Sequence, residues 1–260
     1  MNKLFGMAAK AALAASLTLA AGSALAEERI SQQRAIDARV AKVKLGGVIN
    51  LHIKQGATPA LILIGDKEQV ARITVTQSGD TLHIDTEGNR GWNFGKNKKH
   101  DVRAELTMPN LNELTSHGVG ATDVKGFTGN ELKVVLDGAG AVTVDSAYQN
   151  LVARLGGVGS MTLTSPGADQ VDVRLRGAGH MALHGASKTL RADLGGVGSL
   201  DAQKLVSNAV ELDMSGLGSA TVYAKTSANI KLSGMGSATV YGNPATRSAD
   251  SRGMGSISWE

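Results

Sequence analysis

The chain has 260 residues with 27 basic and 23 acidic side chains, a formal net charge of +4, and no cysteine. The absence of cysteine excludes a disulfide framework and a lipid-anchored N-terminal cysteine. The near balance of charge argues against nucleic acid as a main partner. The fold must therefore be stabilised by burial of apolar side chains and by backbone hydrogen bonds.

Residues 1–26 have the pattern of a cleaved secretory signal peptide. Lys3 precedes an apolar stretch at 11–21, and Ala-Leu-Ala at 24–26 fits the cleavage site. The apolar stretch is shorter than the roughly 20 residues of a membrane-spanning helix, and no later segment is comparably hydrophobic. We therefore expect a periplasmic or secreted mature chain without a transmembrane segment. Removing Lys3 and Lys10 leaves 25 basic against 23 acidic residues, a charge of +2.

Residues 27–110 alternate between apolar and polar side chains in short segments, which predicts β-strands. The clearest segments are 60–64, 72–76, 81–85 and 102–108, with a turn at 77–80. Leu-Gly-Gly-Val at 45–48 repeats Leu-Gly-Gly-Val at 155–158, so a first, degenerate copy of the later repeat begins near residue 38. We expect hairpins here that lead into the repeats and cap their open end.

The loop at 88–100 combines aromatic and basic side chains. They are Arg90, Trp92, Phe94, Lys96, Lys98 and Lys99. Such loops bind anionic polymers or membrane surfaces through charge and cation–π contacts. The other interpretation is a hairpin tip that its lysines keep in solution. Binding of an anionic envelope polymer through this loop is one alternative function.

Residues 111–260 form a repeat in which Gly-x-Gly occurs eight times, at intervals of 18 to 20 residues. The first glycines are Gly118, Gly138, Gly157, Gly177, Gly196, Gly216, Gly234 and Gly253. Every second residue on both sides of each copy is apolar, which predicts strand, corner, strand. A fixed period of this length is typical of stacked coils. The sequence predicts an all-β fold, a parallel β-solenoid of eight to nine coils on the order of 35 to 40 Å long.

The two glycines of each copy are expected to point inward, where a side chain would collide with the facing wall. The next position is mostly serine, a column able to cross-link neighbouring coils. The residue between the glycines would then point outward and form an apolar ridge, a usual mark of an interface. The alternative is a corner that reverses the alternation and buries this column. The candidate partner-binding residues are Val197, Leu217, Met235 and Met254, with Tyr223 and Tyr241 on adjacent coils.

A family resemblance follows from Gly-Gly-Val-Ile-Asn at 46–50, Met-Pro-Asn-Leu at 108–111 and the recurring Gly-x-Gly-Ser blocks. Together they resemble the bacterial GIN-type domain, a family described as candidate heads of autotransporter adhesins. The resemblance covers nearly all of the mature chain and implies a right-handed β-solenoid on an exported protein. Its motifs specify coil geometry, and it supplies no catalytic residues.

Asp193 and Asp213 should lie one coil apart, a spacing close to that of the carboxylate pair in retaining glycosidases. A carbohydrate-active enzyme is therefore a second alternative function. However, nearly every acid on this face has a basic neighbour, which is typical of a solvated, charge-compensated surface. His180 and His184 would be about 13 Å apart along one strand, too far to share a metal ion. We expect no cofactor and no metal.

The sequence thus favours a non-enzymatic, exported β-solenoid that acts as a structural, adhesion-like or envelope-associated binding module. Its partner would be a protein or an envelope polymer bound at the solenoid surface. No capping segment precedes the end at Glu260. We therefore expect the last coil to be exposed or paired, which offers a route to a homo-oligomer.

Overall fold

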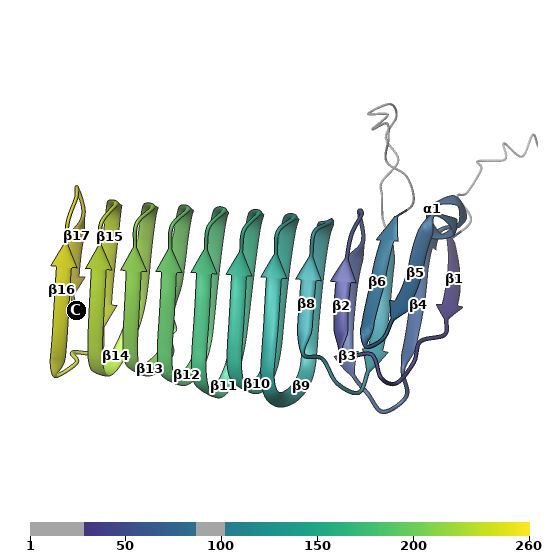
Figure 1. Cartoon of the computed structure of the whole chain (residues 1–260), viewed down its shortest axis with the longest axis horizontal. Helices are drawn as coiled ribbons and strands as arrows, with labels where there is room; N and C mark the ends of the chain where they lie inside the picture. Colours follow the sequence, from purple (N-terminus) through teal and green to yellow (C-terminus); the bar gives the residue numbers. More distant parts are fainter. Residues whose placement is uncertain (1–28, 87–101) are drawn as a thin grey trace, which may run out of the picture.

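The structure is a computed structural model that describes residues 29–86 and 102–260. In these ranges the chain forms a parallel β-solenoid of about seven turns, with almost no helix. The coils are stacked along the long axis, with the N-terminal strands at one end and the last coil at the other (Figure 1). The predicted fold class is confirmed. The proposed signal peptide and the 88–100 loop lie outside the described residues.

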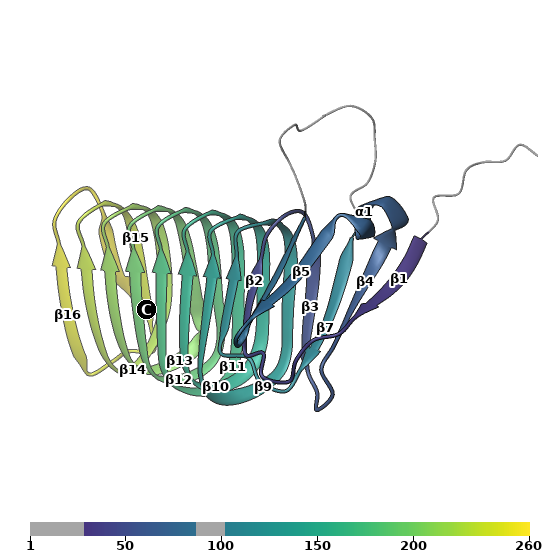
Figure 2. The same cartoon turned by 45° about the vertical axis from the view of Figure 1, so that its right-hand side comes forward.

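Six long, bent strands make the complete coils. They are β9 (Val119–Leu136), β10 (Ala139–Leu155), β11 (Val158–Leu175), β12 (Ala178–Leu194), β13 (Val197–Met214) and β14 (Leu217–Leu232). In the next coil two shorter strands, β15 (Met235–Tyr241) and β16 (Thr246–Ser251), pair with the first and second halves of β14. The last strand is β17 (Ser256–Trp259). Figure 2 shows the coils as parallel loops that follow one another along the axis.

Successive copies of the repeat lie in register. Val119 pairs with Ala139, Ala139 with Val158, and the series continues to Met235. Apolar residues at every second position point inward, as the sequence predicts. In β11, for example, Val171 is 2% exposed, Val173 0% and Leu175 1%. Each coil is too thin to bury these side chains alone, so neighbouring coils complete the core.

The N-terminal end is capped by eight shorter strands and one helix. They are β1 (Arg29–Arg34), β2 (Lys42–Leu45), β3 (Asn50–Gln55), β4 (Ala60–Asp66), α1 (Lys67–Ala71), β5 (Ile73–Ser78), β6 (Thr81–Thr86), β7 (Arg103–Met108) and β8 (Glu113–Ser116). The pairs β1–β4, β4–β7 and β5–β6 are antiparallel. The four strands predicted in this region are present, with ends that differ by one or two residues.

The degenerate first copy of the repeat is part of the solenoid. β2 pairs in parallel with β8, β3 pairs in parallel with β9, and Val48 bridges to Val119. On their other side β2 and β3 pair with β6 and β7 of the cap. This coil therefore joins the cap to the repeats. Two elements were not predicted: β1, and α1, whose first turn is capped by the Asp66 carboxylate accepting from the Glu68 N–H at 2.8 Å.

The reason given above for the paired glycines is wrong. A Cβ on Gly138 would lie 2.0 Å from the carbonyl oxygen of Gly118 in the preceding coil, not against the facing wall. The same oxygen accepts the Ala139 N–H at 3.0 Å, so it cannot move away without loss of a hydrogen bond between coils. Glycine is required because two backbones approach each other closely.

Candidate contact surface

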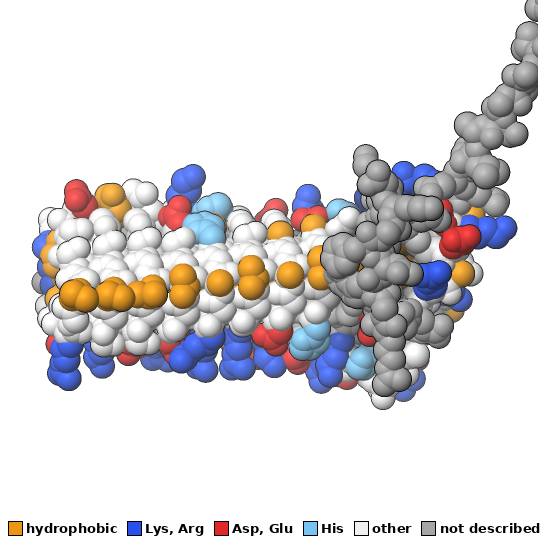
Figure 3. All heavy atoms as spheres, turned by 90° about the horizontal axis from the view of Figure 1, so that it is seen from above, with side chains coloured by type: hydrophobic (Ala, Val, Ile, Leu, Met, Phe, Trp, Pro, Cys, Tyr) orange, Lys and Arg blue, Asp and Glu red, His pale blue; other side chains and the backbone are white. Residues whose placement is uncertain are grey.

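The residues between the paired glycines form a continuous row on the outside of the solenoid, here called the ridge. The ridge consists of Val119, Ala139, Val158, Ala178, Val197, Leu217, Met235 and Met254. The exposed fraction is 56% for Val197, 44% for Leu217, 49% for Met235 and 78% for Met254. The alternative of a buried column therefore does not hold. Figure 3 shows the ridge as a row of hydrophobic side chains along the molecule.

A groove of about 710 Å³ runs along one side of the ridge. Its floor is the column of first glycines from Gly177 to Gly253, and Leu217, Met235 and Met254 line its ridge side. Its other side consists of the residue that precedes each first glycine. These corner residues are Arg176, Gly195, Ser215 and Ser233. The groove is open because neither glycine nor serine fills the space beside the larger ridge side chains.

Hydroxyl side chains border the other side of the ridge. The serine column is in register, for example Ser199 with Ser219 and Ser219 with Ser237. The structure gives this column one cross-link between coils through side chains, from His180 Nδ1 to Ser199 Oγ at 2.8 Å. Charged side chains gather along the margins of this face and not beside the ridge (Figure 3).

Tyr223 and Tyr241, predicted on adjacent coils, are direct register partners in β14 and β15. Both are partly exposed and lie on the strand that starts at a ridge residue, beyond Thr221 and Thr239. The C-terminal coils thus combine methionine, leucine, tyrosine and hydroxyl side chains on one face. Tyrosine and methionine are enriched in protein interfaces, and charged residues are depleted from interface cores. The surface has the composition of a contact site.

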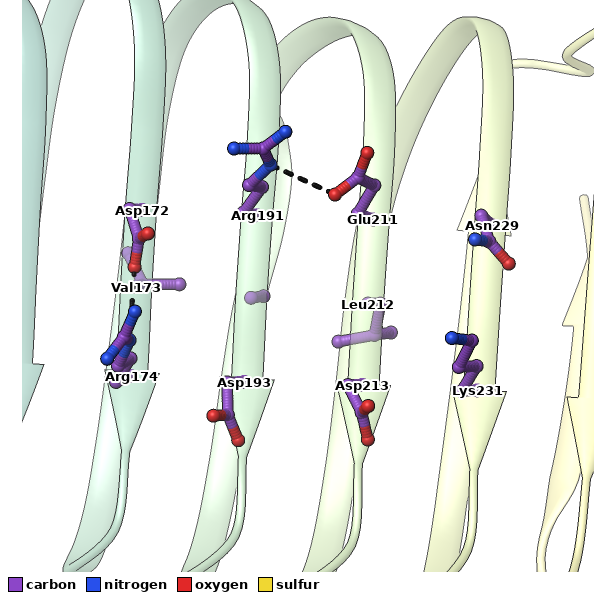
Figure 4. A pocket seen from close by; sticks show the side chains of 11 residues that line it. Asp172, Val173, Arg174, Arg191, Asp193, Glu211, Leu212, Asp213, Asn229 and Lys231 are labelled. Atoms are coloured by element: carbon purple, nitrogen blue, oxygen red, sulfur yellow. Dashed lines mark hydrogen bonds and ion pairs between the residues drawn. The ribbon is translucent and has the colours of Figure 1, made fainter.

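The carboxylate face lies on the second halves of the strands. Asp193 and Asp213 are register partners and line a shallow pocket of about 250 Å³ (Figure 4). Arg176 forms a salt bridge with Asp193. One row along the same pocket, Arg191 binds Glu211 at 2.9 Å. The pocket lining contains no aromatic side chain that could stack on a sugar ring.

The charge compensation predicted for this face continues towards the N-terminus. In the first coils, Lys133 Nζ donates to Glu113 Oε1 at 2.9 Å, and this hydrogen bond lowers the pKa of the Glu113 carboxyl. Arg174 and Asp172 form a further pair at 3.4 Å. These ion pairs link or border coils on an exposed surface, an arrangement that needs no substrate to explain it.

We expect the double variant Asp193→Asn, Asp213→Asn to keep its fold. The Arg176–Asp193 pair is exposed, with side-chain exposures of 63% and 36%. Removing such a pair changes the free energy of unfolding by less than about 1 kcal/mol. Urea denaturation followed by circular dichroism measures this change. Any glycan-hydrolysing activity of the chain that is lost in the double variant and kept in an Asn229→Ser control would instead identify a catalytic pair.

Histidines do not converge on a metal site in the described ranges, where no group of three or more His, Cys, Asp or Glu side chains could hold an ion. His52 Nδ1 lies 3.0 Å from an Asp123 carboxylate oxygen, and His180 is bound to Ser199. These histidines therefore have partners on the protein surface. The described part of the chain also contains no helix long and apolar enough to span a membrane.

The last coil has a free edge in the described structure. β16 pairs with β14 and β17 with β15, each on one side, and every residue of β16 is exposed. Arg247 lies over the Trp259 ring, 5.1 Å from its centroid. The unpaired backbone groups of this edge are a second surface at which another strand could bind.

The fold and the ridge define the class of protein: a β-solenoid that presents a periodic contact surface. The chain belongs to the family described as "Putative auto-transporter adhesin, head GIN domain", whose model matches residues 40–244. The family resemblance of the sequence is thereby confirmed. A comparison with curated proteins found no match.

Several solved structures share the fold. A "putative adhesin" from Bacteroides fragilis NCTC 9343 is 24% identical with a TM-score of 0.64, over 90% of this chain and 98% of that chain. A "putative adhesin" from Parabacteroides merdae ATCC 43184 is 16% identical with a TM-score of 0.77, over 90% and 96%. A "Putative lipid binding protein" from Parabacteroides distasonis ATCC 8503 is 20% identical with a TM-score of 0.77, over 89% and 96%. At these identities the likeness shows the fold.

The groove is the feature that sequence reasoning missed. Its signal is present in the chain, because the residue before each first glycine is small in three successive copies, at Gly195, Ser215 and Ser233. This position attracts attention only when it is compared with the ridge residue two positions later. Small side chains beside large exposed ones predict a groove beside a ridge.

Proposed function

We propose that this protein is an exported, non-enzymatic binding module of the adhesion type, which binds a protein partner through its ridge and the hydroxyl-rich strip beside it. The observation that carries the proposal is the row of large apolar side chains, 44% to 78% exposed from Val197 to Met254. Burying such side chains on a partner is favourable by about 25 cal/mol per Å² of apolar area. Folding has left this free energy unused.

The adhesin description of the family supports a contact function, and the signal-peptide pattern of residues 1–26 supports export. The ion-paired carboxylate face supports the absence of catalysis, since its acids are compensated by arginines and lack stacking platforms. A contact surface of regularly spaced side chains suits a partner with an extended, equally regular face.

We expect charged substitutions on the ridge to abolish binding without unfolding the chain. The variant is Leu217→Lys, Met235→Lys, Met254→Lys, whose positions are exposed. Desolvating three ammonium groups opposes any apolar contact, so retention of partner proteins from envelope extracts should fall at least about tenfold. Circular dichroism and the urea midpoint should stay unchanged.

The matched control carries three lysines away from the ridge, in Gln203→Lys, Asn229→Lys, Ser248→Lys, all at exposed positions. It should keep the retention of the native chain. Equal retention by the ridge variant and the native chain would rule out the ridge as the binding surface. Loss of folding in the ridge variant would show that the ridge serves the fold. Retention of phospholipid vesicles in place of proteins would assign the surface to lipid.

A further inference from the structure

The ridge and the groove lie side by side on one face and run the same length of the C-terminal coils. Such a pair is self-complementary. If a second copy is rotated by 180° about an axis parallel to the solenoid, its ridge faces the groove of the first copy. The groove of the second copy then receives the ridge of the first. A two-fold axis across the solenoid would instead place ridge on ridge and leave both grooves empty.

We propose that the partner of the ridge is a second copy of this chain, in a parallel, side-by-side dimer with each ridge in the groove of the other. This inference rests on the proposed function and names the partner of the same surface. A second copy matches the ridge in spacing by construction, because both solenoids repeat every 4.8 Å or so along their axes. A partner of any other fold would lose register within a few coils.

Same-level pairing also matches side-chain volume. In the parallel arrangement each ridge residue meets the corner residue of the same coil in the other copy. The pairs are Val197 with Gly195, Leu217 with Ser215, and Met235 with Ser233. Each large apolar side chain thus meets a small, uncharged one. In the single chain these columns are both at the surface, so internal packing does not require the leucine and methionines to be there.

Charge does not oppose the arrangement. The charged corner residues near the ends of the groove are Arg176 and Arg252, which form ion pairs with Asp193 and Asp250 within the chain. Between them the corner residues Gly195, Ser215 and Ser233 are uncharged. The paired surfaces therefore bring apolar side chains together without burying an uncompensated charge.

The size of the surface sets the expected strength. The ridge is roughly 34 Å long, seven spacings between eight coils. With a width of about 15 Å it buries about 500 Å² per copy, about 1,000 Å² in total, the lower end of specific interfaces. A dimer of this size dissociates in the micromolar range, so it forms where the chain is concentrated, as on a cell surface.

Cysteine cross-linking tests the arrangement, since the chain has no cysteine of its own. Val197→Cys, Leu217→Cys and Met235→Cys are made singly in the mature chain and treated with a short bismaleimide. An axis parallel to the solenoid brings each position close to its own copy, so all three variants should give covalent dimers. Asn229→Cys, exposed on the opposite face, should not. A cross-link at one ridge position alone would indicate antiparallel copies and overturn the proposal, as would none.

Sedimentation over a concentration series separates this inference from the proposed function. The native chain should show a dimer that the Leu217→Lys, Met235→Lys, Met254→Lys variant loses, while the three-lysine control keeps it. A chain that is monomeric throughout, yet retains another protein through its ridge, would refute the dimer and leave the binding function intact. A dimer without any ridge-dependent retention of other proteins would refute a separate protein partner and leave the dimer.

Discussion

Replacing Gly198 by alanine is expected to lower the free energy of unfolding by about 3 kcal/mol. A Cβ at this position would lie 1.9 Å from the carbonyl oxygen of Gly179 in the preceding coil and 2.9 Å from its carbonyl carbon. The obstacle is backbone and not a side chain that could rotate away. Accommodating one methyl group therefore requires the coils to separate locally, with strain on the hydrogen bonds on both sides.

The matched control is Gly167→Ala. A Cβ on Gly167 would meet no atom within 4 Å, and the backbone there has no positive φ. Alanine restricts the unfolded chain more than glycine does, so this variant should be neutral or more stable by up to about 1 kcal/mol. Urea unfolding of both variants gives the comparison. Equal stability of the Gly198 and Gly167 variants would mean that the close approach of coils is not what requires glycine.

Replacing Tyr148 by alanine should cost about 3 to 5 kcal/mol of unfolding free energy, the loss typical of a large buried aromatic ring. Tyr148 in β10 is 2% exposed, and its hydroxyl donates a hydrogen bond to the carbonyl oxygen of Leu111. The ring therefore packs in the core while its hydroxyl ties the second complete coil to the segment before β8. Tyr148→Phe keeps the ring and loses this bond, at a cost of about 1 to 2 kcal/mol.

Alkaline pH gives a second measure of the same group. Burial raises the pKa of Tyr148 to about 12, above the ordinary value of 10. The folded state therefore holds the proton more tightly than the unfolded state, and its stabilising effect is present below pH 10. It is lost as the pH rises from about 10 towards 12. Urea midpoints measured over this range should fall less steeply in Tyr148→Phe than in the native chain; identical slopes would contradict the assignment.

The strands of the repeats were predictable because each is written twice, by period-two alternation and by the 19-to-20-residue interval. Leu151, Ala153 and Leu155 alternate with polar residues, and they are 2%, 1% and 0% exposed. The carboxylate face was predictable for the same reason: once copies are aligned, Asp193 falls beside Asp213 and Arg191 beside Glu211.

Other features depend on contacts between distant segments. β2 and β3 were recognisable as a copy of the repeat, but their insertion between the cap and β8–β9 joins segments about 70 residues apart. The helix α1 is five residues long, too short to show a helical period. Its buried Val70 gains its environment from the cap strands.

The sequence by itself determined the β-solenoid, the register of its coils and the family, because a local period propagates through identical coil-to-coil contacts. Only the tertiary structure decided which way the residues at each corner face. At a corner the alternation passes through two glycines, which have no side chain to show direction. The backbone contact between Gly118 and Gly138 fixes that direction. It turns Leu217 and Met235 outward and leaves the groove beside them.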